Sequence, residues 1–279
     1  MSRVLVIGSL HPTSRAIGER LAAMGLEVQY AAGNLDALHH LRMRPFGVVI
    51  TFPESQIDED LALLKEMREV RPRVKCILLT SHATPEETIA ALRQKAFACF
   101  SAPYQEEAIA DLAFNAASSS EWRDEIDVVT ARPGWVTLRA NCHLLTADRL
   151  LTFMRELNSQ LPETEMTEMI RGLREILMNA MEHGTAFSVE QTIEVTAVRT
   201  ARSIVFYVRD PGPGFRRGKL ADGTVAGPHD HPLSHIAKRE NLGLRPGGYG
   251  LTMAGGIVDE LIYSDLGNEV LLIKYTDHD

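Results

Sequence analysis

The sequence contains little that would anchor it in a membrane or stabilise it outside the cell. Only three of its 279 residues are cysteines, and Cys76, Cys99 and Cys142 lie far apart, each within an apolar run. An odd number of cysteines without the spacing of metal ligands indicates small core side chains in a reducing compartment. The sequence also lacks any run of about 18 apolar residues and any basic-then-apolar leader at its start. We therefore expect a cytoplasmic protein that does not interact with membranes.

An excess of positive charge is also missing. The chain has 29 Lys and Arg residues against 37 Asp and Glu residues, which gives a formal net charge of -8. Binding to phosphate backbones or anionic lipids requires a basic surface, so direct nucleic-acid binding is not expected. A composition that is 45% hydrophobic and 24% charged is typical of a soluble globular protein. The length is sufficient for two domains of ordinary size.

The first part of the chain alternates between short apolar runs and helical patterns. We predict strands at residues 4–7, 28–31, 47–51, 74–80 and 97–101, and helices at 14–24, 35–43, 58–70, 85–95 and 105–117. Continuous apolar strands separated by helices indicate a parallel sheet that is covered on both faces. This pattern predicts an α/β doubly wound (flavodoxin-like) domain over residues 1–118.

The pattern changes after a polar stretch, which we interpret as a linker over residues 119–133. Beyond it we predict strands at 135–142, 192–198, 203–209, 260–264 and 269–275, with helices at 146–161, 164–183 and 251–258. Several strands with helices on one face indicate an α+β sandwich. The second predicted domain therefore covers residues 134–279.

The helix at 164–183 contains the sequence EILMNAMEHG, which carries three polar residues at four-residue intervals. Residues i, i+4 and i+8 lie on one face of an α-helix, so we expect Glu175, Asn179 and His183 to share a face. Gly184 is expected to end the helix as a left-handed cap. An acid, an amide and an imidazole in a line on a largely apolar helix indicate a functional site.

Two glycine-containing stretches have the chemistry of a nucleotide site. In DPGPGF, Asp210 follows a predicted strand and can accept a hydrogen bond from an exocyclic amine, while Gly212 and Gly214 allow a ligand to approach the backbone. In GGYGL, Gly248 and Gly250 precede a predicted helix whose N-terminus can hold phosphate oxygens. Either stretch alone could be an ordinary turn. Their combination with the helix motif predicts a nucleotide pocket.

The three motifs together resemble the ATPase superfamily of gyrase, histidine kinases and MutL repair proteins, and most closely its anti-sigma factor serine kinases. The resemblance spans roughly residues 134–276. It implies ATP and Mg²⁺ as cofactors, with Asn179 holding the metal ion and Glu175 orienting or deprotonating the attacking group. It implies that Asp210 binds the adenine amino group and that His183 belongs to the site, although a histidine near a helix C-terminus can instead serve the helix dipole.

The sequence departs from this family at two places. The family often has Gly-Thr before its last strand, where this chain has Gly267-Asn268, and the segment between Phe215 and Gly247 is long. That segment contains three histidines, His229, His231 and His235, which suggest a zinc site. No fourth ligand has a suitable spacing, so we interpret the segment as a nucleotide lid.

Residues 2–117 resemble the receiver domain of response regulators, but the residues that accept phosphate are missing. The acidic pair expected after the first strand is replaced by Gly8-Ser-Leu-His11, and Thr51 stands where the phosphorylated aspartate belongs. Ala102 replaces the lysine before Pro103, whereas Thr80 retains the expected hydroxyl. We therefore predict a degenerate receiver-like module that is not phosphorylated.

We hypothesise that the chain is an ATP-binding signalling regulator that phosphorylates Ser or Thr on a protein partner. The resemblance implies partners of the anti-anti-sigma antagonist or sigma factor type, and the receiver-like module could also form a homodimer. An alternative is a module whose protein binding depends on nucleotide, without phosphotransfer. A histidine kinase is a third candidate, but residues 118–162 do not have the pattern of a helical hairpin with an exposed histidine.

Overall fold

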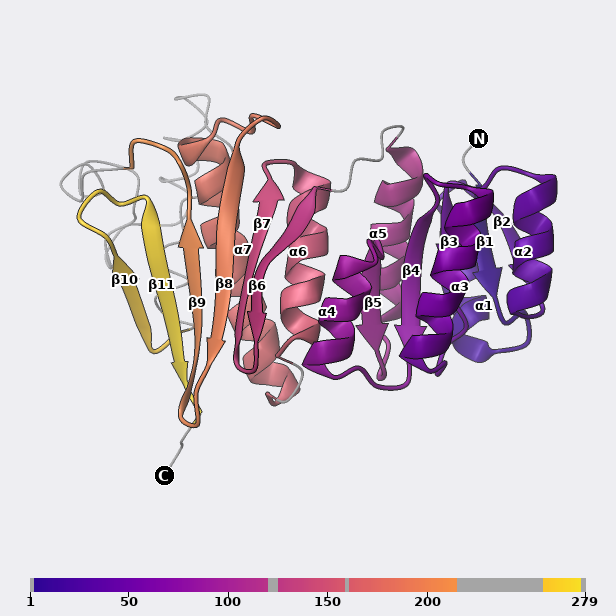
Figure 1. Ribbon diagram of the computed structural model, residues 1–279, viewed down its shortest axis with the longest axis horizontal. Helices are drawn as coiled ribbons and strands as arrows, with labels where there is room; N and C mark the ends of the chain where they lie inside the picture. The colour runs from indigo at the N-terminus through magenta and orange to yellow at the C-terminus, as the bar shows by residue number, and fades with distance from the viewer. Residues whose placement is uncertain (1–2, 120–124, 159–160, 215–257, 277–279) are drawn as a thin grey trace. The chain divides into compact units, whose positions relative to one another are not determined.

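The computed structural model describes residues 3–119, 125–158, 161–214 and 258–276 (Figure 1). The chain forms two compact units, which are described separately. The first consists of Met1–Asp127 and Asp148–Ser159, and the second of Val128–Ala147 and Gln160–Asp279. Within the described residues, no helix combines the length and the apolar character that crossing a membrane requires.

The first unit is built on a five-stranded parallel sheet with the order β2-β1-β3-β4-β5. Its strands are β1 (Arg3–Ile7), β2 (Glu27–Ala31), β3 (Val48–Ile50), β4 (Lys75–Thr80) and β5 (Ala98–Ser101). Every residue of β3 and β4 is buried. Strands that are covered on both faces must be apolar throughout, which explains the continuous apolar runs in the sequence.

Five helices connect these strands: α1 (Pro12–Ala23), α2 (Asn34–Met43), α3 (Ile57–Val70), α4 (Pro85–Arg93) and α5 (Glu106–Ser118). Helix α1 packs against α5, and α3 packs against α2 and α4, as expected when helices cover both faces of a sheet. The start of α4 is fixed by a capping box, in which Thr84 and Glu87 each bond the other's backbone N–H. The strand order and the two helical layers confirm the predicted receiver-like fold.

A sixth helix, α6 (Leu144–Glu156), also contributes to the first unit from Asp148 onward. Its Arg149 is only 2% exposed and donates a hydrogen bond of 2.8 Å from Nε to the carbonyl oxygen of Phe97. The guanidinium carbon also lies 4.6 Å from the centre of the Phe97 ring. A buried cation is tolerated when its donors are satisfied and an aromatic face lies beneath it.

Arg149→Ala is expected to destabilise the first unit by about 2–3 kcal/mol, because a buried charged hydrogen bond is lost and a carbonyl oxygen stays unsatisfied. Hydrogen exchange at the amides of β5 measures the free energy of opening of this unit. Arg93→Ala, at an exposed position in α4, is the matched control and should change it by less than about 0.5 kcal/mol. Equal protection of β5 in both variants would contradict the assigned role of Arg149.

The second unit contains a six-stranded sheet with the order β10-β11-β9-β8-β7-β6. Its strands are β6 (Ile126–Arg132), β7 (Trp135–Asn141), β8 (Thr192–Arg199), β9 (Ser203–Arg209), β10 (Glu260–Tyr263) and β11 (Glu269–Tyr275). Alternate residues of β9 are buried, and α7 (Glu163–Asn179) packs against β9 and β11. This confirms the predicted α+β architecture of the C-terminal domain.

Strand β6 was not predicted, because residues 126–132 fall in the stretch that we interpreted as a linker. The strand carries Asp127 and Arg132 near its ends and lies at the edge of the sheet. Charged side chains are common on edge strands, where they oppose pairing with other chains, and here they obscured the alternating pattern. The compact units therefore differ from the predicted domains both in β6 and in α6. Of the helix predicted at 251–258, residues 251–257 lie outside the described residues.

Candidate functional site

Asp210 follows β9 directly and is held by hydrogen bonds on both sides of its backbone. Its N–H donates to the carbonyl oxygen of Asn268 at 3.0 Å, and Asn268 Nδ2 donates to the carbonyl oxygen of Asp210 at 3.2 Å. The Asp210 side chain accepts a further bond from Gly212 N–H at 2.8 Å, and the residue is 9% exposed. The carboxylate therefore has a fixed position and little contact with water.

Two glycines allow the protein backbone to approach this carboxylate closely. A Cβ atom on Gly184 would lie 2.2 Å from Asp210 Oδ1, and one on Gly212 would lie 2.5 Å from the carbonyl oxygen of Gly184. Both distances are too short for any side chain, so glycine is required at each position. Gly184 ends the helix motif and Gly212 belongs to DPGPGF. The structure thus brings two of the three predicted motifs together.

The loop between β10 and β11 closes the other side of DPGPGF. Gly214 has a φ of +70°, and a Cβ atom there would lie 1.9 Å from the carbonyl oxygen of Leu266. Gly267, also in this loop, has a φ of 79°. Backbone in the left-handed region at both glycines lets the two loops pack against each other. The loop that carries Asn268 and the loop that carries Asp210 are therefore in direct contact.

Burial changes the acidity of Asp210. Loss of hydration raises the pKa of its carboxyl group above the usual value, and the bond from Gly212 N–H opposes this shift. A partly dehydrated carboxylate accepts a hydrogen bond more strongly than one in water. It is therefore suited to accept a hydrogen bond from an amino group of a ligand.

Glu175 and Asn179 lie one turn apart on α7, and both side chains are half-buried. Their four-residue spacing places them on one face of the helix, as predicted. An amide oxygen is a suitable Mg²⁺ ligand, and a carboxylate can accept a proton or orient a hydroxyl. Among the described residues there is no group of three or more His, Cys, Asp or Glu that could hold a metal. A cation at Asn179 would therefore need ligands other than such a group.

The helix does not continue as a regular α-helix from Asn179 to His183. After Asn179 the chain forms a π-helical turn, η1 (Ala180–Gly184). A π-helical turn holds more residues than an α-helical one, which changes the direction in which successive side chains point. His183 is exposed in this turn. Four residues still make up nearly one turn, so the predicted common face of Asn179 and His183 stays a prediction.

Gly184 is not the left-handed cap that we predicted. The left-handed residues follow it, at Ala186 with a φ of 50° and Phe187 with a φ of 55°. Thr185 Oγ1 and Phe187 N–H both donate to the carbonyl oxygen of Met181, at 2.9 and 2.8 Å. These bonds end the helix after the π-helical turn. The glycine is required by the close approach of Asp210 and not by its own backbone angles.

Part of the predicted site lies outside the described residues. This applies to Gly248 and Gly250 of the GGYGL motif and to the histidines of the predicted lid, His229, His231 and His235. Their roles in phosphate binding and in a lid therefore stay predictions.

Several residues of the site were not predicted from the sequence. Gly184 was interpreted only as a cap, and Asn268 only as a departure from a family pattern. Cys142, which is fully buried, lies close to Asp210: burial raises the pKa of its thiol, hydrogen bonding to Thr185 lowers it, and the charge of Asp210 raises it. A buried cysteine after a strand gives no signal in the sequence that it lies beneath a carboxylate.

The receiver-like unit has a closed, buried cluster in the region of Thr51. Thr51 follows β3, is fully buried, and accepts a 2.9 Å hydrogen bond from Leu79 N–H at Oγ1. Asp60, which is 1% exposed, accepts a 2.6 Å bond from Ser55 Oγ. Burial raises the pKa of Asp60 to about 7, although hydrogen bonds from Ser55 and Thr51 oppose the shift. Burial therefore favours the protonated form of this carboxyl group over the carboxylate.

The loop after Thr51 is fastened over this cluster. Thr80 Oγ1 donates to the carbonyl oxygen of Ser55 at 2.8 Å, and Tyr104 OH donates to the carbonyl oxygen of Thr80 at 2.7 Å. The same Tyr104 oxygen accepts a 2.7 Å bond from Glu54 N–H. The hydroxyl of Thr80, retained from the receiver pattern, is therefore engaged by the loop.

We expect acetyl phosphate with Mg²⁺ to leave the intact mass of the protein unchanged. Thr51 has no carboxylate, its hydroxyl is buried, and Asp60 is shielded by Ser55 and the loop. Mass spectrometry after treatment checks this result, and a receiver domain with an intact acidic site is the positive control. A phosphoryl adduct on Asp60 or Glu54 would contradict the closed arrangement.

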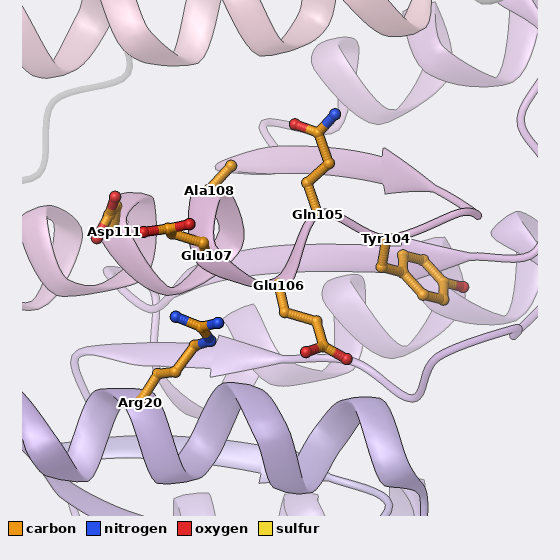
Figure 2. Close-up of a pocket in the computed structure, with 7 residues that line it drawn as sticks. All are labelled: Arg20, Tyr104, Gln105, Glu106, Glu107, Ala108 and Asp111. Atoms are coloured by element: carbon orange, nitrogen blue, oxygen red, sulfur yellow. The ribbon is translucent and has the colours of Figure 1, made fainter. Parts of the chain in front are cut away.

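A surface cavity of about 460 Å³ lies in the first unit, beside the start of α5. It is lined by Arg20, Tyr104, Gln105, Glu106, Glu107, Ala108 and Asp111 (Figure 2). Most of its charge is negative, which disfavours phosphate-containing ligands. The charge of this cavity therefore makes it a poor nucleotide site.

A comparison against protein families gave one match, which covers the region around Asp210. Residues 140–274 match the family described as the histidine kinase-like ATPase domain. The matched range includes the whole of α7, η1 and the Asp210 loop. This part of the chain is therefore similar to a histidine kinase-like ATPase domain. A comparison with curated proteins gave no match.

Solved structures similar to this chain include receiver domains. A response regulator from Thermotoga maritima is 21% identical, with a TM-score of 0.39 and coverage of 43% of this chain and 99% of that chain. A CheY-like receiver domain protein from Methanospirillum hungatei JF-1 is 20% identical, with a TM-score of 0.36 and coverage of 41% and 92%. The receiver-like fold rests on the strand order and the helix packing of the first unit and not on these similarities.

Proposed function

We propose that the protein is an ATP-dependent signalling regulator whose C-terminal domain phosphorylates Ser or Thr on a protein partner. The observation that carries this proposal is the carboxylate of Asp210, fixed between Gly184 and Gly212 at the end of the helix that bears Glu175 and Asn179. This arrangement joins a site for an amino-bearing base to an acid and an amide that can act on phosphate chemistry. The match to an ATPase family supports the nucleotide part of the proposal.

Each residue has a distinct role in the proposed reaction. Asp210 accepts a hydrogen bond from the adenine amino group, and Gly212 and Gly214 shape the base pocket. Asn179 supplies an oxygen ligand for Mg²⁺, and Glu175 orients the partner's hydroxyl and takes its proton. Bound Mg·ATP supplies the phosphoryl group that is transferred. Gly248, Gly250 and His183 are proposed to contribute to binding of the nucleotide phosphates and the lid.

The receiver-like unit is proposed to dock or dimerise the protein without being phosphorylated. In this proposal the chemistry by which receivers are switched is absent, because Thr51 replaces the phosphorylated aspartate and Asp60 is buried. The partners we propose are proteins of the anti-anti-sigma antagonist or sigma factor type, as the sequence resemblance implies. The same site also suits a second candidate, a binder whose affinity for protein changes with nucleotide, because Asp210 can hold a base without any phosphotransfer.

Asp210→Asn is expected to weaken ATP binding by about 1–3 kcal/mol, the contribution of a buried charge-assisted hydrogen bond. An amide places a donor where the adenine amino group also donates, and so the bond is lost. Isothermal titration calorimetry with ATP and with ADP measures the effect. Glu190→Gln, which removes a charge from an exposed position in the same unit, is the control. Absence of measurable nucleotide binding by the unmodified protein would disprove the proposed function.

The same bond predicts how ATP binding depends on pH. The carboxylate form of Asp210 is the hydrogen-bond acceptor, and burial raises the pKa of this group. ATP affinity should therefore fall on acidification at a higher pH than an ordinary aspartate would show, and this loss should be absent from Asp210→Asn.

A further inference from the structure

The sheet of the second unit has one face covered by α7 and an opposite face, here called the outer face, that carries several exposed or half-buried apolar side chains among polar ones. Antiparallel sheets that face water normally carry polar residues on the solvent side. On the outer face, Trp135 is 49% exposed and Ile262 is 43% exposed. Contiguous apolar side chains on a protein surface commonly mark an interaction site.

The apolar residues of the outer face form two rows that cross the strands. In the first row Trp135 pairs with Val198, Val198 with Val205, and Val205 with Ile273. In the second row Tyr207 pairs with Leu271, and Leu271 with Ile262. Paired residues on neighbouring strands lie on the same face and about 5 Å apart, so each row is continuous. The first row alone runs across four strands, from β7 to β11.

A charged row lies at one end of the outer face, beyond the apolar rows. Glu269 pairs with Arg209, Arg209 with Glu194, and Glu194 with Arg139. Ion pairs join Arg209 to Glu269 at 3.5 Å and Arg139 to Glu194 at 2.7 Å. The sign of the charge therefore alternates from β11 to β7. When the row is read in the opposite direction, each position that held a positive charge holds a negative one, and each negative position holds a positive one.

We propose that a second copy of this chain covers the outer face, sheet against sheet, around a two-fold axis that runs along the strands between β8 and β9. In the partner, such an axis reverses the order of the strands across the sheet, so that β11 lies opposite β7 and β9 opposite β8. Positions along the strands are unchanged, so the charged rows of the two copies lie at the same end. Glu269 then faces the partner's Arg139, and Arg209 faces the partner's Glu194. In the apolar rows, Val205 faces the partner's Val198, and Ile273 faces the partner's Trp135.

The order of charges favours a second copy over an unrelated partner. A basic or an acidic partner surface would meet equal numbers of like and opposite charges in this row, whereas the same row reversed meets only opposite charges. Aligned packing of two sheets is also a common arrangement, with the inner side chains forming a core about 10 Å thick. The interface does not involve Asp210 or the nucleotide, so it is independent of the proposed function.

Sedimentation velocity of the full-length protein tests the proposal through charge reversal. Arg139→Glu and Glu269→Arg each create two like-charge contacts in a symmetric dimer, because each contact occurs twice. We expect each variant alone to dissociate with a dissociation constant raised about 100-fold. In an equimolar mixture of the two, every contact is again between opposite charges, so a heterodimer of near wild-type affinity should form.

Controls separate this interface from general effects of charge. Lys65→Glu and Glu66→Arg make the same changes in net charge at exposed positions of α3 and should leave the dimer unchanged. Ile262→Ser removes apolar surface from an exposed position and should weaken the dimer without unfolding the sheet. A monomeric wild-type protein at its highest soluble concentration would overturn the proposal. A dimer that persists in both single variants, or a mixture that stays monomeric, would overturn it as well.

Discussion

Glu175→Ala is expected to leave the affinity for ATP within a few-fold of the unmodified value and to slow phosphotransfer about 10²–10⁴-fold, the usual contribution of a general base. The side chain is half-buried on α7, one turn before Asn179. In the proposed reaction it acts on the attacking hydroxyl and does not touch the base of the nucleotide. Transfer of labelled phosphate to a partner protein, measured in single turnover, separates chemistry from binding.

Two further variants make this test specific. Asn179→Ala should instead weaken Mg²⁺-dependent nucleotide binding itself, because a direct metal ligand is removed. Glu168→Ala removes a carboxylate from an exposed position two turns earlier on the same helix and should change neither quantity. Equal rates of transfer by Glu175→Ala and the unmodified protein would exclude the role of Glu175. If the unmodified protein transfers no phosphate while nucleotide alters its affinity for a partner, the binding module is correct.

The stability of the first unit is expected to decrease as the pH rises, because Asp60 is buried. The pKa of this group is about 7 in the folded protein, against 3.8 for an aspartate that is exposed to water. Below the lower value both the folded and the unfolded state are protonated and the group has no effect. Between the two values only the folded state retains the proton, so stability falls by about 1.4 kcal/mol per pH unit, in total on the order of 4 kcal/mol. Above the higher value the loss is complete.

Asp60→Asn should remove this dependence, since an amide resembles the protonated carboxyl group and has no charge to bury. Hydrogen exchange at the amides of β3 and β4, corrected for intrinsic rates, gives the opening free energy of this unit. Between about pH 5 and pH 8 the unmodified protein should lose about 3 kcal/mol more than the variant. Glu66→Gln, at an exposed position of α3, is the control. Parallel pH profiles for Asp60→Asn and the unmodified protein would show that Asp60 is not the cause.

The elements of the first unit could be predicted because each obeys a local rule. Strands that are buried on both faces are continuous apolar runs, and Pro85 marks the start of α4. The predictions failed for elements whose position depends on contacts between residues distant in the sequence. Strand β6 depends on pairing with β7, and α6 contributes to the first unit through Arg149, whose contact with Phe97 joins residues distant in the sequence. Such contacts leave no periodicity in the sequence.

The sequence was sufficient to nominate the residues of the candidate site but not to predict how they pack. The spacing of Glu175 and Asn179 and the position of Asp210 after a strand were sufficient to place all three in a nucleotide motif. The π-helical turn was not predictable, since the sequence AMEHG is compatible with an ordinary helix end. The requirement for Gly184 arises from the carboxylate of Asp210, which reaches it from another element. Only the folded chain shows that Gly184 of the helix motif and Gly212 of DPGPGF pack against each other and against Asp210.

The hydrogen bonds that hold the loop beside Asp60 have a consequence for how the first unit could respond to a signal. In a receiver, a covalent mark persists after the upstream signal has ended and thus acts as a short-lived memory. If the first unit accepts no phosphoryl group, as the buried Thr51 and the bond from Thr80 to Ser55 lead us to predict, no such mark forms at this position. A response that depends on this unit would then follow the instantaneous concentration of whatever binds it, and would end as soon as that molecule dissociates.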